Sequence, residues 1–459
     1  MAVMAKSVAV EQEGLGKAPE KQEAKVSSAV ELESIGGFSL LEALIDGVQN
    51  LNPERKARRD IFLQEGGKKA ERTALKKKMG EWISLLKGAS STAEIVEQGN
   101  IKLQSAEKNL KENLKRALDS TRELEQSYRS VSLFYKNTEQ DKLKNISIVN
   151  ASMDQLTDLD NPRFIEKIAK ELKQSFDRLD LRKNYSLLVV PGYLGSNKVV
   201  ERWAKMAYDN KVMLVTDFQH FDRPDDAMEV FESANLAGGD AYRANVMMAC
   251  NWLVGRSKTD WVNEEEDLFV PPSAALAGRL YSTLMSQITA GKKYGGINEV
   301  DATAFDLTKS ELSQLERMGL IPMVQEYGKV MAFSGKTLFN GDNIGLQTYS
   351  VVRVFDYITK VLFDFLNRRA FENWDTSVEL DVKDQIVNYL NTVTGNGRLI
   401  EYFNIMKLER DEDQKDRILL DIHITPFFPA KSFVLKLDGY KGEDESVTWK
   451  SDVQQKGDA

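Results

Sequence analysis

The sequence has very few of the residues that carry common nucleophilic and metal chemistry. Its 459 residues include one cysteine, Cys250, and two histidines, His220 and His423, which lie far apart in the chain. A single cysteine excludes a disulfide within the chain and fits a reducing compartment. Two separated histidines leave no local pattern for a zinc site or a histidine-based catalytic relay. We therefore expect no catalytic residue, no metal and no cofactor, and we interpret Cys250 as a small buried apolar side chain.

Long apolar runs and a surplus of basic charge are also missing. No stretch reaches about 18 consecutive apolar residues, the length of a membrane span, and residues 1–10 lack the apolar core of a secretory signal. The net charge is −8, whereas nucleic-acid binding needs a basic surface. Hydrophobic residues make up 42% and charged residues 29% of the chain, which is a globular balance. These features predict a cytoplasmic protein that neither inserts into a membrane nor binds nucleic acid.

The N-terminal part combines a polar segment with a short apolar helix. Residues 1–33 are small, charged and polar, which predicts a mobile arm. After Gly36 and Gly37, residues 38–45 predict a helix with one apolar face, and Ser39 with Glu42 forms a capping box. This helix opens a predicted helical region over residues 34–140.

Residues 101–136 predict one long helix. Apolar or small side chains recur at spacings of three and four among polar and charged residues, and neither proline nor glycine interrupts them. At 1.5 Å per residue the helix is about 50 Å long, which exceeds the diameter of a small compact domain. Its narrow stripe is typical of a helix that pairs with another helix. Two partners remain open: residues 70–98 of this chain, in an internal hairpin, or a helix of a partner subunit.

Residues 141–375 alternate between strand and helix patterns, which predicts a central α/β domain with a partly parallel sheet. We expect strands at 146–149, 185–190 and 212–215 and a strand pair at 320–333. The expected helices span 163–179, 198–210, 240–254, 273–291, 308–318 and 345–369. The whole chain is therefore expected to be a mixed α+β protein.

The C-terminal part, residues 376–440, predicts a helix at 382–393 followed by a β-hairpin. Apolar residues recur at every second position over 418–424 and again over 433–437, and residues 426–430 connect the two runs. A two-stranded hairpin is marginal alone and leaves two open edges. The body of this chain or neighbouring subunits should therefore add strands to it. Residues 441–459 are read as a polar tail.

Two segments imitate ligand sites. Residues 334–337 (SGKT) resemble the end of a phosphate-binding loop, but Val330 stands where that loop needs a glycine. The acidic run 264–267 lacks the spacing of a calcium loop, and we interpret it as solvated. Neither segment supports a site.

At this point the order of segments resembles a known family, the large sheath subunit (TssC/VipB) of type VI secretion systems. Residues 39–45 (SLLEALI) resemble its "SLLDxII" helix, and residues 124–131 (LEQSYRSV) resemble its "LEGxWRGL" signature, with Tyr128 in place of the tryptophan. Further similar segments are residues 185–189 (YSLLV), 315–324 (LERMGLIPMV) and 349–355 (YSVVRVF). The resemblance spans about residues 38–440 and identifies a divergent branch.

The resemblance implies a structural subunit without catalytic activity. In this family a large and a small sheath subunit (TssB/VipA type) pair through long helices and stack as a helical sheath on a baseplate, around a tube of Hcp-type hexamers. Contraction of the sheath propels the tube, neighbouring protomers are joined by β-augmentation, and an AAA+ ATPase of the ClpV type recycles the contracted sheath.

The resemblance places three sets of interface residues. Contacts with the small subunit are expected from Leu110, Leu114, Leu124 and Tyr128. The inter-protomer sheet is expected to use Ile418, Leu420, Ile422, Phe433 and Leu435. The N-terminal connector is expected to use Phe38, Leu40, Leu41 and Leu44. All three sets could instead be internal core. The alternatives for the whole chain are a sheath protein of a related contractile tail or injection particle, an α/β enzyme that binds phosphate through Lys336, and a cytosolic scaffold of unrelated fold.

Overall fold

The computed structural model describes residues 64, 66–139, 143, 146–430, 433–440 and 446–453. The chain divides into two compact units, Met1–Arg116 and Ala117–Ala459, each described here by itself. The predicted arm (1–33) and the connector residues Phe38, Leu40, Leu41 and Leu44 lie outside the described residues.

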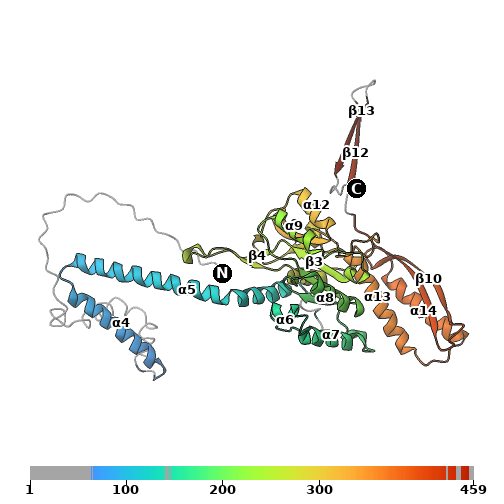
Figure 1. The fold of residues 1–459 in the computed structure, drawn as a ribbon, viewed down its shortest axis with the longest axis horizontal. Helices are drawn as coiled ribbons and strands as arrows, with labels where there is room; N and C mark the ends of the chain where they lie inside the picture. Colours follow the sequence, from blue (N-terminus) through green and yellow to red (C-terminus); the bar gives the residue numbers. More distant parts are fainter. Residues whose placement is uncertain are drawn as a thin grey trace, which may run out of the picture. The chain divides into compact units, whose positions relative to one another are not determined.

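The first unit contains helix α4 (Lys69–Gly88) and the first part of α5 (Thr92–Lys136), after a short 3-10 turn, η1 (Gly66–Lys68). The Ser91 hydroxyl caps α5 by accepting from the Glu94 N–H, and the Glu94 carboxylate accepts from the Ser90 N–H. The predicted long helix is confirmed, and it begins earlier, at Thr92. Its 45 residues span about 67 Å. Within this unit, Figure 1 shows α4 and the first part of α5 diverging from their turn, so these two segments do not form the internal hairpin.

A six-stranded sheet forms the centre of the second unit. Its order is β1-β2-β3-β8-β9-β6, and β1, β2, β3 and β8 are parallel neighbours. The registers include Leu187↔Met213 and Met248↔Leu320. The strands are β1 (Leu187–Val190), β2 (Met213–Asp217), β3 (Val246–Cys250), β8 (Leu320–Glu326), β9 (Lys329–Ala332) and β6 (Gly296–Ile297). The prediction of a mixed α+β protein with a partly parallel sheet is confirmed.

Helices cover both faces of this sheet. On one face, Trp203 and Phe231 pack with Leu214 and Met248 of the strands. On the other face, Leu133 of α5 and Leu276 pack among strand residues that alternate with the first set, such as Met213 and Met247. The first layer contains α7 (Arg163–Phe176), α8 (Asn197–Asp209), α9 (Pro224–Ala234) and α12 (Lys309–Arg317), and the second contains α10 (Ser273–Ser282), α13 (Tyr349–Arg368) and the end of α5.

A smaller sheet lies beside the end of α5 and has the order β5-β4-β7. Its strands are β4 (Leu253–Arg256), β5 (Leu268–Val270) and β7 (Ala302–Thr303). The remaining short elements are α6 (Met153–Thr157), η3 (Leu181–Lys183), η4 (Ala241–Asn245), η5 (Asp260–Val262) and α11 (Gly291–Tyr294).

The C-terminal part builds its own core from two helices and a hairpin. Val354 and Ile358 of α13 and Ile386 of α14 (Thr376–Val393) pack against inward residues of β10 (Ile400–Arg410) and β11 (Ile418–Pro426), including Phe403 and Ile422. Strands β12 (Phe433–Tyr440) and β13 (Ser446–Val453) form a second antiparallel hairpin.

Several predicted elements are wrong. Residues 146–149 form no strand, and α10 ends at Ser282, where an extended Thr283 follows it. Residues 240–254 contain η4, β3 and the start of β4 instead of a helix. The run from Val246 to Cys250 is buried on both faces, and such a run shows no period that separates strand from helix.

The predicted C-terminal hairpin is wrong in its pairing. β11 pairs with β10, through Ile405↔Ile422, and β12 pairs with β13 inside the predicted polar tail. Two register irregularities in β10 break the alternation that would have identified that strand.

Candidate assembly surfaces

The predicted stripe on α5 is exposed along its length. We call this set the α5 seam: Leu103, Leu110, Leu114, Ala117, Thr121, Leu124, Tyr128 and Val131. Leu110 is 56% exposed, Leu124 70% and Tyr128 73%. From Leu110 onward the spacing alternates strictly between four and three residues, which is the heptad pattern of helix pairing.

The opposite face of α5 is bound to the second unit's own body. Gln126 donates to the Phe269 carbonyl at 2.9 Å and Arg129 donates to the Gly255 carbonyl at 2.7 Å. Leu133 is buried in the core beneath the central sheet. Gly278 of α10 lies so close that a Cβ there would meet the Phe134 carbonyl oxygen at 2.5 Å. The end of α5 is therefore fixed on one face while its seam stays uncovered among the described residues.

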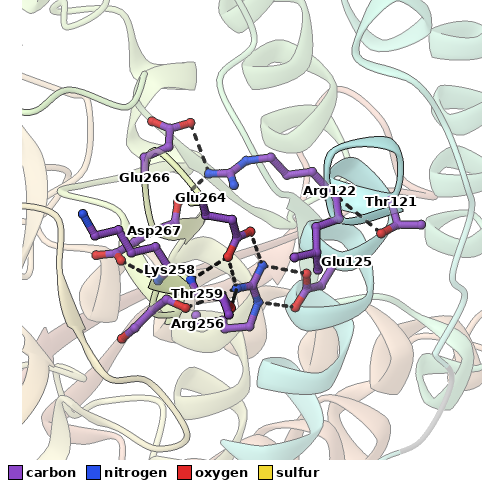
Figure 2. A network of polar contacts seen from close by, with 12 residues as sticks. Thr121, Arg122, Glu125, Arg256, Lys258, Thr259, Glu264, Glu266 and Asp267 are labelled. Atoms are coloured by element: carbon purple, nitrogen blue, oxygen red, sulfur yellow. Dashed lines mark hydrogen bonds and ion pairs between the residues drawn. The ribbon is translucent and has the colours of Figure 1, made fainter. Parts of the chain in front are cut away.

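A network of ion pairs completes this attachment, and Figure 2 shows its side chains converging between α5 and the β4–β5 loop. Arg256 donates to both carboxylate oxygens of Glu264, at 2.8 and 2.9 Å, and to Glu125 of α5 at 3.1 Å. Arg122 pairs with Glu266 at 3.2 Å and also donates to the Asp267 carbonyl. We call Arg122, Glu125, Arg129, Arg256 and Glu264 the polar clamp.

Glu264 corrects the interpretation of residues 264–267 as solvated. Its side chain is only 4% exposed, and it also accepts from the Thr259 N–H at 2.7 Å. The hydrogen bonds from Arg256 lower the pKa of Glu264 from 4.5 to about 2. The sequence offered one signal for this pair: Arg256 precedes a short loop that returns acidic residues toward its strand.

We predict that this carboxylate makes stability depend on acid pH. Because its pKa is lower in the folded chain, Glu264 contributes stability above pH 4.5, and that contribution is lost as the pH falls toward 2. Between pH 4.5 and 2, the unfolding free energy of the Glu264→Gln protein should therefore fall by about 2 kcal/mol less than that of the wild type. Urea unfolding followed by circular dichroism at several pH values measures it, and parallel curves for the two proteins would contradict the assignment.

The predicted inter-protomer strand residues are distributed over two hairpins. Leu420 and Ile422 lie on β11 and pack against the core formed with α13 and α14, and Ile418 is half-buried at the start of that strand. Phe433 and Leu435 lie on β12, where the described backbone pairs them with Val453 and Ser451. The structure therefore does not bring all five residues together: three lie on β11 and two lie on β12.

The segment that resembles a phosphate-binding loop is closed by packing. A Cβ at Gly335 would clash with the Ile288 side chain. Lys336 donates to Gln347, and the buried Thr337 hydroxyl donates to the Leu346 carbonyl at 2.6 Å. The backbone therefore leaves no cradle for a phosphate at this position.

The remaining chemistry-bearing residues do not converge. Cys250 is buried in the core of the central sheet, and burial raises the pKa of its thiol. Within the described ranges, no group of three or more His, Cys, Asp or Glu side chains is arranged to hold a metal ion. None of the helices in those ranges combines the length and apolar character that a bilayer crossing requires.

Solved structures of contractile sheaths share similarity with the chain. The helical sheath of the anti-feeding prophage in its contracted state is 16% identical over 68% of this chain and 81% of that chain, with a TM-score of 0.47. The contracted sheath complex of the PVC extracellular contractile injection system is 14% identical over 66% of this chain and 90% of that chain, with a TM-score of 0.45. None of the curated proteins compared with the sequence matches it significantly.

Family models give the assignment, because they match three consecutive parts of the chain. The N-terminal region of TssC/VipB-like proteins matches residues 26–114, the central domain of type VI secretion system TssC/VipB matches residues 116–340, and the C-terminal domain matches residues 348–455. The matches follow one another in the order of the family, and the described fold is mixed α+β, as the strand and helix patterns predict. The chain belongs to the TssC/VipB family and is a structural large subunit of a type VI secretion contractile sheath.

Proposed function

We propose that this large subunit binds a small sheath subunit of the TssB/VipA type through the α5 seam. The pairs then polymerise with further copies, on a baseplate and around an Hcp-type tube, into a cytoplasmic sheath. Contraction is a change between two helical packings of these units. The subunit has no catalytic activity of its own, and an ATPase of the ClpV type recycles the contracted sheath.

The observation that carries this proposal is the uncovered seam on a helix whose other face is already bound. Each large apolar side chain buried by a partner contributes about 1.5–3 kcal/mol, so several seam residues together supply a stable interface. In a straight α-helix, positions seven residues apart are rotated by about 20° relative to one another. A partner helix that stays in contact with the whole seam therefore coils around α5.

The C-terminal hairpins support joining between protomers. In the described part of the chain, β10 and β11 pair with each other and β12 and β13 pair with each other, so each two-stranded sheet has edges that a further strand can extend. Because Leu420 and Ile422 point into the core, augmentation here uses the strand edges and their main-chain groups.

Co-purification tests the proposed pairing. The full chain with an affinity tag, co-expressed with the small sheath subunit of its own locus, should retain that subunit through washing in roughly equal amount. A chain that elutes alone and stays monomeric in size-exclusion chromatography would contradict the proposal.

A further inference from the structure

A polar pocket of about 310 Å³ lies in the second unit, at the point where α5 ends. Its wall includes Lys136, the last residue of α5, and Thr138, which follows the helix. Arg279 and Ser282 of α10 lie in the same wall. Among the described residues that line the pocket, Glu139 alone is acidic. Two cations and several hydroxyl groups therefore favour an anionic group in this pocket.

Arg279 has unused hydrogen-bonding capacity in this wall. Its Nε atom and the Thr138 hydroxyl are buried, and neither has a hydrogen-bond partner in the part of the chain that the structure describes. The Nη2 atom of Arg279 donates to the Tyr294 carbonyl across 3.4 Å, which is a long hydrogen bond. Buried polar groups in folded proteins are nearly always paired, and a guanidinium group binds a carboxylate through two parallel hydrogen bonds. A carboxylate would satisfy these donors.

Other contacts hold the wall of the pocket in place. Asn137 donates to the Asn298 carbonyl at 3.2 Å and accepts from the Asn298 N–H at 2.8 Å. Ser282 donates to the Asn137 carbonyl at 3.3 Å, which joins α10 to the end of α5. Because the wall is ordered before a ligand arrives, binding there loses little conformational freedom.

The complementary charge lies on the opposite face of the central sheet. Helix α9 contains no basic residue and carries four exposed carboxylates: Asp225, Asp226, Glu229 and Glu232. α9 packs in the first layer, whereas α10 and the end of α5 pack in the second. The helix dipole favours acidic residues only in the first turn, and Glu229 and Glu232 lie beyond it.

We propose that the pocket beside Arg279 receives a carboxylate of α9 from the next copy of this chain in the sheath. This inference rests on the proposed function, because it names a contact between the copies that polymerise. A contact between two different surfaces of one chain is heterologous, and its repetition builds an open helix when the rotation does not close a ring. Opposite charges on opposite faces of one sheet suit such a contact, and they disfavour stacking of like faces.

The test uses charge reversals in the full chain, co-expressed with the small sheath subunit of its own locus. Arg279→Glu reverses the pocket, and Glu229→Lys/Glu232→Lys reverses exposed positions of α9. A third protein combines both changes, so that the two surfaces are complementary again with exchanged signs. Arg178→Glu is the matched control, because Arg178 is an exposed arginine after α7. Polymer is measured as the fraction that pellets on ultracentrifugation, and pairing as co-purification of the small subunit.

We expect the pocket and α9 variants each to lower the pelleted fraction by about fivefold or more, and the combined variant to recover at least about half of it. The Arg178→Glu protein should pellet within about twofold of wild type. All four variants should still retain the small subunit, because none changes the α5 seam. Circular dichroism checks that each variant is folded, and the α9 variant tests the contact even if Arg279→Glu disturbs the fold.

Three outcomes would overturn the inference. If folded pocket and α9 variants pellet normally and retain the small subunit, the contact is wrong and the proposed pairing stands. If only Arg279→Glu loses polymer and the combination does not restore it, the carboxylate comes from another source, such as the small subunit or a free anion. If the wild-type chain neither retains the small subunit nor pellets, the proposed function fails and the inference fails with it.

Discussion

Leu124→Asp/Tyr128→Asp should abolish binding of the small sheath subunit while the chain itself stays folded. Both side chains are more than two-thirds exposed, so their replacement removes little from the fold. In the proposed complex they lie in the C-terminal half of the seam, and each truncation at an interface hot spot costs about 2 kcal/mol or more. We expect the affinity for the small subunit to fall by more than about a hundredfold, measured by isothermal titration calorimetry.

A matched control uses another exposed leucine and tyrosine. Leu380 is 57% exposed on α14 and Tyr327 is 70% exposed in the β8–β9 turn, away from the seam in the sequence. Leu380→Asp/Tyr327→Asp should leave the affinity within about twofold of wild type. Equal losses in both double variants would show that the seam has no special role in binding.

Arg256→Ala should destabilise the second unit by about 3 kcal/mol, because removing one member of a largely buried ion pair leaves the other charge unpaired. Arg256 holds Glu264 with two hydrogen bonds and Glu125 with two more, so its loss affects the β4–β5 loop and its attachment to α5 together. Arg256→Lys should recover only part of the loss, since an ammonium group cannot reproduce the planar fork that spans two carboxylates. Chemical denaturation followed by tryptophan fluorescence measures both variants.

The control for this prediction is an arginine in a solvent-exposed pair. Arg182 is 88% exposed and binds Asp180 at 2.9 Å. Because exposed pairs contribute little, Arg182→Ala should leave the unfolding free energy close to that of the wild type. An Arg256→Ala protein as stable as this control would show that the polar clamp does not hold α5 to the body.

The sequence was sufficient for elements with a clear period. The long helix α5, the amphipathic helices α7 and α8 and the buried strands β1 and β2 were predicted from spacing, because their apolar faces repeat at 3.6 residues or their runs end at turn residues. The seam was also visible in the sequence, since it lies on a helix whose flanking residues are charged. That the side chains of the seam are exposed could be learned only from the structure.

Pairing between distant segments could not be read in the same way. The partner of β11 is β10, whose register irregularities hide its alternation. The sequence pattern therefore favours the next alternating run, residues 433–437, as the partner. The burial of Glu264 depends on the position of Arg256 and Glu125, which are brought together by the fold. Local pattern carries no information about such contacts.

The central claim is that this chain builds a contractile sheath together with a small subunit. The most direct test is negative-stain electron microscopy of cell lysates that co-express the chain with the small sheath subunit of its own locus. We predict long hollow tubes that require both chains and that are absent from lysates with the Leu124→Asp/Tyr128→Asp variant. Dispersed particles without tubes, although both proteins are folded and abundant, would contradict the account.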